Sequence, residues 1–436
     1  MNEKQRWQPG FRCVSWVILL LCCCMPAQDA LTEDVVDRST LFGKVMCGYQ
    51  GWFACPGDDL GRGWYHWGRG PDFGPGKVSI DLWPDVSELD EDEKCPTPFV
   101  HADGSTAHVF SSQHPKTVNR HFKWMKEYGI DGAFVQRFGS EVIGSELQYR
   151  QFTRVLENAR SGASEHGRAY ALMYDLSGLR AGHVALLQDD FNRLLDEGVI
   201  LGGTDAAYLH HRGKPVVAIW GVGFSDDRSY TLAECAELVQ FFKTHPAAPG
   251  GEGFTVMLGV PTYWRLLERD AVDDPFLHDI LRMADIISPW SVGRYVDAAG
   301  AERLAQEVWR ADMEWCSENN LDFLPVVFPG FSWHNLYGGP LDQVPRHGGA
   351  FLWAQYRALH GLGATMVYQA MFDEVDEATA IFKCTNDPPV NGTFLTYEDL
   401  PTDHYLWLTG MGGKLIRREI EATEALPVRS PETAEE

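Results

Sequence analysis

The sequence has few basic residues for its length. Its 436 residues include 37 lysines and arginines against 61 aspartates and glutamates, which gives a formal net charge of −24. An acidic surface of this kind repels nucleic acid and anionic lipid. We therefore predict no nucleic-acid partner, and we interpret acidic runs such as Glu88–Glu93 as solvated surface.

Signatures of metal ions and organic cofactors are also missing. Four of the ten cysteines lie near the N-terminus, and the spacing of the other six fits no zinc or haem motif. We therefore predict no metal and no cofactor. Cys55 and Cys95 stand in loop-like segments and are candidates for a disulfide, but sequence alone leaves the connectivity open. The other four cysteines of this set are Cys47, Cys235, Cys316 and Cys384.

No transmembrane-like run occurs after the first 30 residues. Three basic residues precede the apolar stretch Val14–Met25, which is too short to span a bilayer comfortably and is followed by small residues. We interpret residues 1–30 as a signal peptide cleaved near Ala27 or Ala30, with lipid attachment at Cys22–Cys24 as the alternative. We thus expect an exported protein, periplasmic, extracellular or lipid-anchored, with no integral membrane span after signal removal.

Eight short apolar runs recur through the rest of the chain. They are continuous rather than alternating, as expected for strands that are covered on both faces. Helix-like segments fill most gaps, which is the pattern of an α/β fold of the (β/α)8 barrel type. A doubly wound open sheet is the alternative, but no Gly-rich phosphate loop follows the first run. The runs are residues 44–49, 132–138, 169–176, 215–221, 254–260, 285–290, 323–330 and 365–371.

The segments between the strands complete this organisation. Residues 115–129 place Val118, Phe122 and Met125 at helical spacing and end at a glycine. Residues 50–113 are irregular, rich in Gly, Pro, Trp and Asp, and too long for a plain connector. We predict one catalytic barrel over residues 31–425, a loop insertion over its mouth after strand one, and a flexible acidic tail over 426–436. The other predicted helices are 147–160, 232–245, 302–319 and 349–361.

Active sites of such barrels form at the carboxyl ends of the strands. Aromatic residues stand at most of these predicted ends, and polar residues accompany them. Aromatic rings suit the apolar C–H faces of sugars, while polar groups suit their hydroxyls, so the composition favours a carbohydrate ligand. His66 and Trp67 in "GWYHW" and Arg346 in "PRHGG" join the candidates, although each has a purely structural explanation. The strand-end candidates are Tyr49, Trp52, Gln136, Arg137, Tyr174, Asp175, Trp220, Trp290, Arg294, Tyr295, Trp333 and His334.

Four carboxylates follow the last apolar run. Asp373, Glu374, Asp376 and Glu377 fall within five residues. In a helical turn Glu374 and Glu377 would share one face, with roughly 5–6 Å between their β-carbons. This suits a retaining glycosidase, whose two carboxyl groups lie about 5–5.5 Å apart, and crowding would raise the pKa of one of them. The structural alternative is that acids here meet the positive end of a helix dipole.

At this point the motifs resemble those of a known enzyme group. The chain is similar to glycoside hydrolase family 99, which contains endo-α-1,2-mannosidases and mannanases, and to its relative family 71, which contains α-1,3-glucanases. "GYQGWF" and "YHW" look like the family's first strand and loop. "HPKTVNRHFKWMKEYGIDGAFVQRF", "HHRGKPVVAIWG", "FPGFSW" and "PRHGG" also have counterparts, in order, over most of the mature chain.

The most specific match is "DEVDEATAI", Asp373–Ile381, which resembles the family's Asn-Glu-Trp-x-Glu-Gly-Thr-x-Ile. The resemblance implies that Glu374 is the base on the sugar 2-hydroxyl, which attacks the anomeric carbon internally. It implies that Glu377 is the general acid and then the base. The outcome would be retention without a covalent enzyme intermediate.

Three positions of this motif depart from the family. Asp373 replaces Asn, Val375 replaces Trp and Ala378 replaces Gly. The lost Trp alters the wall of the site, and the extra Asp, itself a candidate for substrate binding, alters its electrostatics. We therefore predict a divergent, exported, retaining glycoside hydrolase that acts on α-linked glycans of the mannan or glucan type. The alternatives are a non-catalytic carbohydrate-binding barrel and a glycosidase acting on xylosyl or arabinosyl units.

Overall fold

The computed structural model describes residues 35–429. The predicted signal peptide, residues 1–30, lies outside the described residues, and so does the tail beyond residue 429. Within the described range, no helix is long and apolar enough to cross a membrane.

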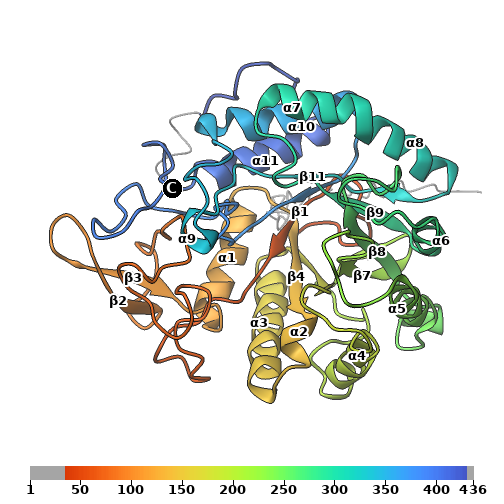
Figure 1. Ribbon diagram of the computed structural model, residues 1–436, viewed down its shortest axis with the longest axis horizontal. Coiled ribbons are helices and arrows are strands. Elements are labelled where there is room, and N and C mark those ends of the chain that lie inside the picture. Colours follow the sequence, from red (N-terminus) through yellow and green to blue (C-terminus); the bar gives the residue numbers. More distant parts are fainter. Residues whose placement is uncertain (1–34, 430–436) are drawn as a thin grey trace, which may run out of the picture. The chain divides into compact units, whose positions relative to one another are not determined.

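Parallel strands form a curled sheet at the eight predicted positions, which confirms the predicted α/β barrel class (Figure 1). The seventh position is split into two short strands. β10 (Asp322–Phe323) pairs with β9 and β11 (Val326–Val327) pairs with β12, so the two pieces together close the ring. Pro325 separates them and has no amide hydrogen to donate to a ladder. The other strands are β1 (Val45–Tyr49), β4 (Gly132–Phe138), β5 (Ala169–Asp175), β7 (Lys214–Trp220), β8 (Thr255–Pro261), β9 (Ile286–Trp290) and β12 (Val367–Gln369).

Helices follow the strands, and the five predicted helices are present. Their ends carry recognisable signals. Thr231 and Glu234 form a capping box at the start of α5, Ser145 caps α3, and α1 begins at a proline. α4, α6 and α11 were not predicted. The longer helices are α1 (Pro115–Glu127), α3 (Glu146–Glu165), α4 (Leu186–Asp196), α5 (Leu232–Thr244), α6 (Phe276–Met283), α7 (Ala298–Leu304), α8 (Arg310–Glu318), α10 (Ala350–Leu362) and α11 (His404–Ile416), and the one-turn helices are α2 (Gly139–Val142) and α9 (His334–Tyr337).

The insertion between β1 and α1 has internal structure that the sequence did not predict. It contains the antiparallel hairpin of β2 (Lys94–Val100) and β3 (Thr106–Phe110), at the left of Figure 1. A disulfide joins Cys55 to Cys95, as the sequence suggested. The backbone amides of Asp81 and Leu82 donate to the carbonyl of Val375 at 2.9 and 3.2 Å. The insertion therefore lies against the acidic segment that follows β12.

Aromatic and sulfur-containing side chains pack inside the barrel near this segment. The rings of Phe134 and Tyr368 stack with centroids 5.6 Å apart. The Tyr368 hydroxyl lies 3.7 and 3.6 Å from the sulfur atoms of Met173 and Met371. A side chain at position 48 would collide with this hydroxyl, since a β-carbon built on Gly48 would lie 2.1 Å from it. The glycine thus lets β1 approach Tyr368 closely.

Candidate active site

The acidic segment after β12 is a tight turn. Residues 375–378 form a non-helical turn, so the expected helical turn is wrong. Ala378 has φ 52°, the left-handed region that favours glycine, at the position where the resembling family has Gly. The buried Arg346 donates from Nη2 to the carbonyls of Ala378 and Ala380, both at 2.7 Å. Arg346 therefore fixes the backbone of the turn, which favours the structural explanation over substrate binding.

Glu374 is almost completely buried, with 4% of its surface exposed. Its Oε2 accepts from the Thr379 hydroxyl at 2.7 Å, and its Oε1 accepts from the Gln50 side-chain amide. Burial raises the pKa of this carboxyl well above its ordinary value, and the charges of Glu377 and Asp376 add to the rise. The two hydrogen bonds oppose the shift because they stabilise the ionised form.

Glu377 is the one carboxylate of the four whose surface is partly exposed. Burial of its carboxyl, followed by the charge of Asp376, raises its pKa to about 7. The Trp333 side chain donates a hydrogen bond to it and opposes the shift, while the charge of Asp175 adds to it. A carboxyl that titrates near neutral pH can hold a proton for donation and take one back.

Asp373 serves a different purpose from the acids around it. It is fully buried, and its Oδ1 and Oδ2 accept from the backbone amides of Gln50 and Gly51 at 2.8 and 2.9 Å. Burial raises its pKa to about 7 against the effect of these hydrogen bonds. Both oxygens are occupied by the loop after β1, so Asp373 anchors that loop rather than facing a sugar, which corrects its assignment to substrate binding.

Asp376 connects the turn to the insertion. Its Oδ2 lies 3.1 Å from His66 Nδ1, and its Oδ1 has no hydrogen-bond partner among residues 35–429. The His66 ring stacks on Trp52 with centroids 3.7 Å apart, and Trp52 stacks on Phe138. His66 therefore lies beside Asp376, and Trp52 lies against His66, whereas Asp376 was left out of the predicted site.

Further predicted residues lie at neighbouring strand ends on the same side of the barrel. Trp220 and Trp290 contact edge to face with centroids 5.4 Å apart, and Trp290 also contacts Tyr368. Asp175 is buried, which raises its pKa, and it is close enough for its charge to act on Glu377. Within residues 35–429, several buried polar atoms near these ends lack hydrogen-bond partners, which is unusual for buried groups and suits a hydroxyl-rich ligand. These atoms are Gln50 Oε1, Trp52 Nε1, Gln136 Oε1 and Trp220 Nε1.

Five predicted residues do not face the barrel mouth. Successive side chains of a strand point to opposite faces, so Gln136 and Arg137 cannot both point inward, and neither can Tyr174 and Asp175. Arg137 and Tyr174 instead bind Asp190 of α4 behind the barrel wall. The other three are Tyr49, which bonds His121 of α1, Trp67, which packs in the insertion, and Tyr295, which bonds Gln355 of α10.

Two predicted residues belong to the rim. Arg294 is exposed and forms an ion pair with Asp270 at 2.7 Å. His334 begins α9, and its backbone amide donates to Asp81 Oδ2 at 2.8 Å. Sequence reasoning missed Gln50 and Thr379, which hold Glu374, although Gln50 directly follows the first strand and the strand-end rule could have included it.

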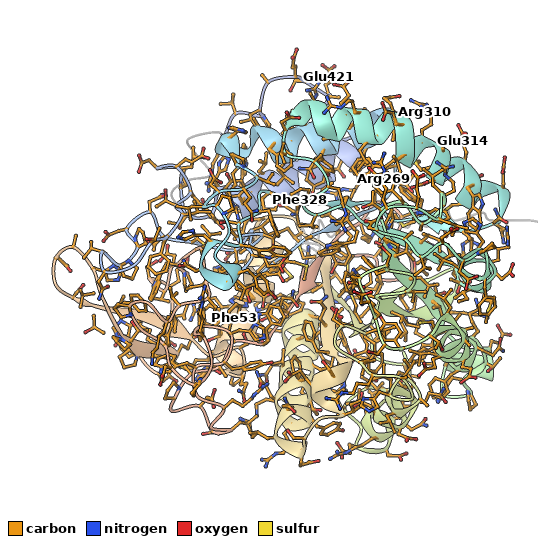
Figure 2. The ribbon with its side chains drawn as sticks, viewed as in Figure 1. Phe53, Arg269, Arg310, Glu314, Phe328 and Glu421 are labelled. Carbon is orange, nitrogen blue, oxygen red and sulfur yellow. A yellow bond between two sulfur atoms is a disulfide. The ribbon has the colours of Figure 1, made fainter. Side chains whose placement is uncertain are left out.

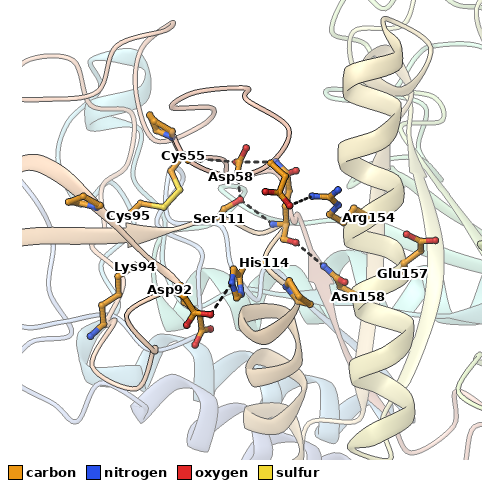
Figure 3. Close-up of a pocket in the computed structure, with 17 residues that line it drawn as sticks. Cys55, Asp58, Asp92, Lys94, Cys95, Ser111, His114, Arg154, Glu157 and Asn158 are labelled. Atoms are coloured by element: carbon orange, nitrogen blue, oxygen red, sulfur yellow. Dashed lines mark hydrogen bonds and ion pairs between the residues drawn. A yellow bond between two sulfur atoms is a disulfide. The ribbon is translucent and has the colours of Figure 1, made fainter.

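Two pockets are relevant to the position of the site. One, of about 690 Å³, is lined by His66, Tyr65, Arg69, Gln148 and Leu336 among others, and so reaches the partner of Asp376. A second, of about 660 Å³, lies beside the Cys55–Cys95 disulfide between the insertion and α3 (Figure 3). No residue of the acidic turn lines this second pocket.

The arrangement is a cluster of carboxyl groups without a counter-cation. Among residues 35–429 no Lys or Arg forms an ion pair with Asp373, Glu374 or Glu377, and no group of His, Cys, Asp and Glu suited to a metal ion occurs there. Two carboxyls at the carboxyl end of a barrel strand, one buried and one partly exposed, provide the groups that glycoside cleavage requires.

Comparison with solved structures places the fold in the same class. The GH99 endo-α-mannosidase from Bacteroides thetaiotaomicron, in complex with BIS-TRIS-propane, has a TM-score of 0.60 and 18% identity, covering 87% of this chain and 99% of that one. A second structure of that enzyme has the same TM-score and coverage with 16% identity. No protein-family model and no curated protein matches the sequence. The chain thus has a GH99-like glycoside hydrolase fold, while the resemblance to family 71 stays a prediction.

Proposed function

We propose that this protein is an exported retaining glycoside hydrolase that acts on α-linked glycans of the mannan or glucan type. On an α-mannoside, whose 2-hydroxyl is trans to the leaving oxygen, Glu374 takes the proton of that hydroxyl as the 2-oxygen attacks the anomeric carbon. An α-glucoside has this hydroxyl cis to the leaving oxygen, so the step applies to the mannan-type substrates. Glu377 donates its proton to the glycosidic oxygen as that bond breaks. Water then opens the resulting 1,2-anhydro sugar, with Glu377 accepting the water's proton and Glu374 returning its proton to the 2-oxygen, so the anomeric configuration is retained.

The observation that carries the proposal is the contrast between the two glutamates. Glu374 is buried and held by donors on both oxygens, whereas Glu377 is partly exposed, accepts from Trp333 and has a pKa of about 7. The two donors stabilise the ionised form of Glu374, which a base requires. Within this coupled pair, burial favours a proton on Glu374, while the two hydrogen bonds to Glu374 oppose it and favour the proton on Glu377, which a general acid requires.

The test compares purified wild-type protein with Glu374→Gln and Glu377→Gln on a panel of α-mannans and α-glucans. We expect the wild type to release reducing sugar and both variants to lose at least about a hundredfold in rate, the usual contribution of general acid–base catalysis. Glu314→Gln is the matched control, because Glu314 projects from α8 into solvent (Figure 2).

Two outcomes would contradict the proposal. If no glycan is cut while Glu377→Gln still binds glycan, the protein is a non-catalytic carbohydrate-binding barrel. If the wild type cuts only substrates with xylosyl or arabinosyl units, the reaction class stands and the substrate assignment is wrong.

A further inference from the structure

Two aromatic side chains at α9, one on the preceding N-cap residue and one on its last residue, are unusually exposed. Trp333 has 38% of its surface exposed and Tyr337 has 72%, and their rings contact edge to face with centroids 5.1 Å apart. Large exposed aromatic rings at a strand end need an explanation, because most aromatic side chains of a chain this size are packed inside.

The backbone beneath these rings is held firmly from the other side. Asp81 of the insertion is fully buried, and its two carboxylate oxygens accept from the amides of His334 and Asn335, both at 2.8 Å. The Asn335 side chain donates to the carbonyls of Ile80 and Thr393, also at 2.8 Å. The short helix is therefore pre-organised, which lowers the entropic cost of binding a ligand on its rings.

The same helix is coupled to Glu377. Trp333 donates a hydrogen bond to the Glu377 carboxyl, and the backbone amide of Ser332 donates to the Glu377 carbonyl at 2.9 Å. Partial burial raises the pKa of Tyr337, and the charges of Glu377 and Asp376 contribute to the rise. Trp333 thus lies beside the group that would protonate the departing oxygen, and the Tyr337 ring lies against Trp333.

We infer that Trp333 and Tyr337 form the binding platform for the leaving-group sugar, the first pyranose on the reducing side of the bond that is cut. This inference rests on the proposed function, because the general acid must lie beside the departing oxygen. The apolar C–H face of a pyranose can pack on the exposed Tyr337 ring, while Trp333 contributes its ring and orients Glu377. Specificity for oligosaccharides over small glycosides then depends on α9.

The test compares wild-type protein with Tyr337→Ala on α-1,2-linked manno-oligosaccharides and α-1,3-linked gluco-oligosaccharides, and on the α-glycosyl fluoride of the sugar that the wild type releases. The fluoride carries no leaving-group sugar. We expect about a tenfold rise in KM for the oligosaccharide with kcat nearly unchanged, and no change on the fluoride. Phe42→Ala is the matched control, since Phe42 is 45% exposed and precedes β1 at the opposite end of the barrel.

Equal losses on both substrates, or no loss on either, would overturn the platform while leaving the proposed function intact. A second measurement does not depend on turnover. In the Glu377→Gln background, calorimetric titration with the same oligosaccharides should show about tenfold weaker binding after Tyr337→Ala. Unchanged affinity would also overturn the platform, and binding of none of these oligosaccharides to Glu377→Gln would reject both proposals.

Discussion

Two groups of buried charge lie on either side of the barrel wall and are treated differently. Behind the wall, Arg137 forms a two-pronged ion pair with Asp190, with both N–O distances at 2.6 Å, and Tyr174 donates to the same carboxylate. At the mouth, no cation within residues 35–429 forms an ion pair with Glu374 or Glu377, and burial raises both of their pKa values. Both groups cost desolvation energy, but only the first offsets it with an opposite charge.

The difference separates structure from chemistry. The ion pair of Arg137 and Asp190 holds helix α4 to the sheet. Its hydrogen-bonding groups are engaged with each other and with Tyr174 rather than with a ligand. Unpaired buried carboxylates destabilise the fold and are retained where their perturbed pKa values are useful. Removing charge should therefore have different effects at the two places. Behind the wall it should lower stability, and at the mouth it should lower activity.

The largest expected effect concerns Glu377. On an oligosaccharide, Glu377→Gln should lower kcat by about a thousandfold, because the departing alkoxide needs a proton. On the α-glycosyl fluoride the loss should be much smaller, because fluoride departs without one. Steady-state kinetics on the two substrates check this, and equal losses on both would remove Glu377 from the role of general acid.

The next effect concerns the paired cluster. Arg137→Met should lower the free energy of unfolding by about 3–5 kcal/mol, because it leaves Asp190 buried without its partner. Arg193→Met, which breaks exposed ion pairs with Glu146 and Glu197, should cost less than about 1 kcal/mol. Urea unfolding measures both losses. Similar losses of unfolding free energy at the two sites would show that burial does not determine how much these ion pairs stabilise the protein.

The pH dependence of stability gives a smaller effect. The folded protein holds the Glu377 proton up to a pKa of about 7, whereas the unfolded chain loses it near 4.5. Between these values the folded state binds more protons, so the stability that Glu377 contributes falls as pH rises. Glu377→Gln has no proton to lose, and should match the wild type near pH 4.5 but exceed its unfolding free energy by about 1–3 kcal/mol at pH 7.5. A difference that shrinks with rising pH would contradict the raised pKa.

The smallest effect concerns Trp333. Its hydrogen bond stabilises ionised Glu377, so Trp333→Phe should raise the pKa of Glu377. The alkaline limb of the kcat/KM profile should then move up by about half a pH unit, since the protonated acid persists to higher pH. A shift in the other direction would show that Trp333 does not donate to this carboxyl during catalysis.

Much of the barrel could be predicted because its strands are buried on both faces and appear as continuous apolar runs. Helix α11 was not predicted because it contains glycines, which are poor helix formers. One of them, Gly410, is needed for packing, since a β-carbon at this position would lie 1.8 Å from the carbonyl oxygen of Tyr128. The acidic turn was located by its position after the last strand. The contact between Asp376 and His66 could not be predicted, since it joins residues 310 positions apart.

Errors in the predicted site have one main physical cause. A position at a strand end does not determine which face of the sheet a side chain lies on. Because successive side chains of a strand point to opposite faces, Arg137 and Tyr174 lie behind the wall, while Gln136 and Asp175 lie on the inner face. Asp373 was expected near substrate for its charge, but backbone amides of the β1 loop occupy both of its oxygens.

The most direct test of the proposed chemistry is the configuration of the first product. Proton NMR during cleavage of an α-linked oligosaccharide should show the α anomer first, with the β anomer appearing only later by mutarotation. Glu374→Gln and Glu377→Gln should give no such signal on the same timescale. Release of the β anomer first, or unchanged release by either variant, would contradict the account of Glu374 and Glu377 as a retaining pair.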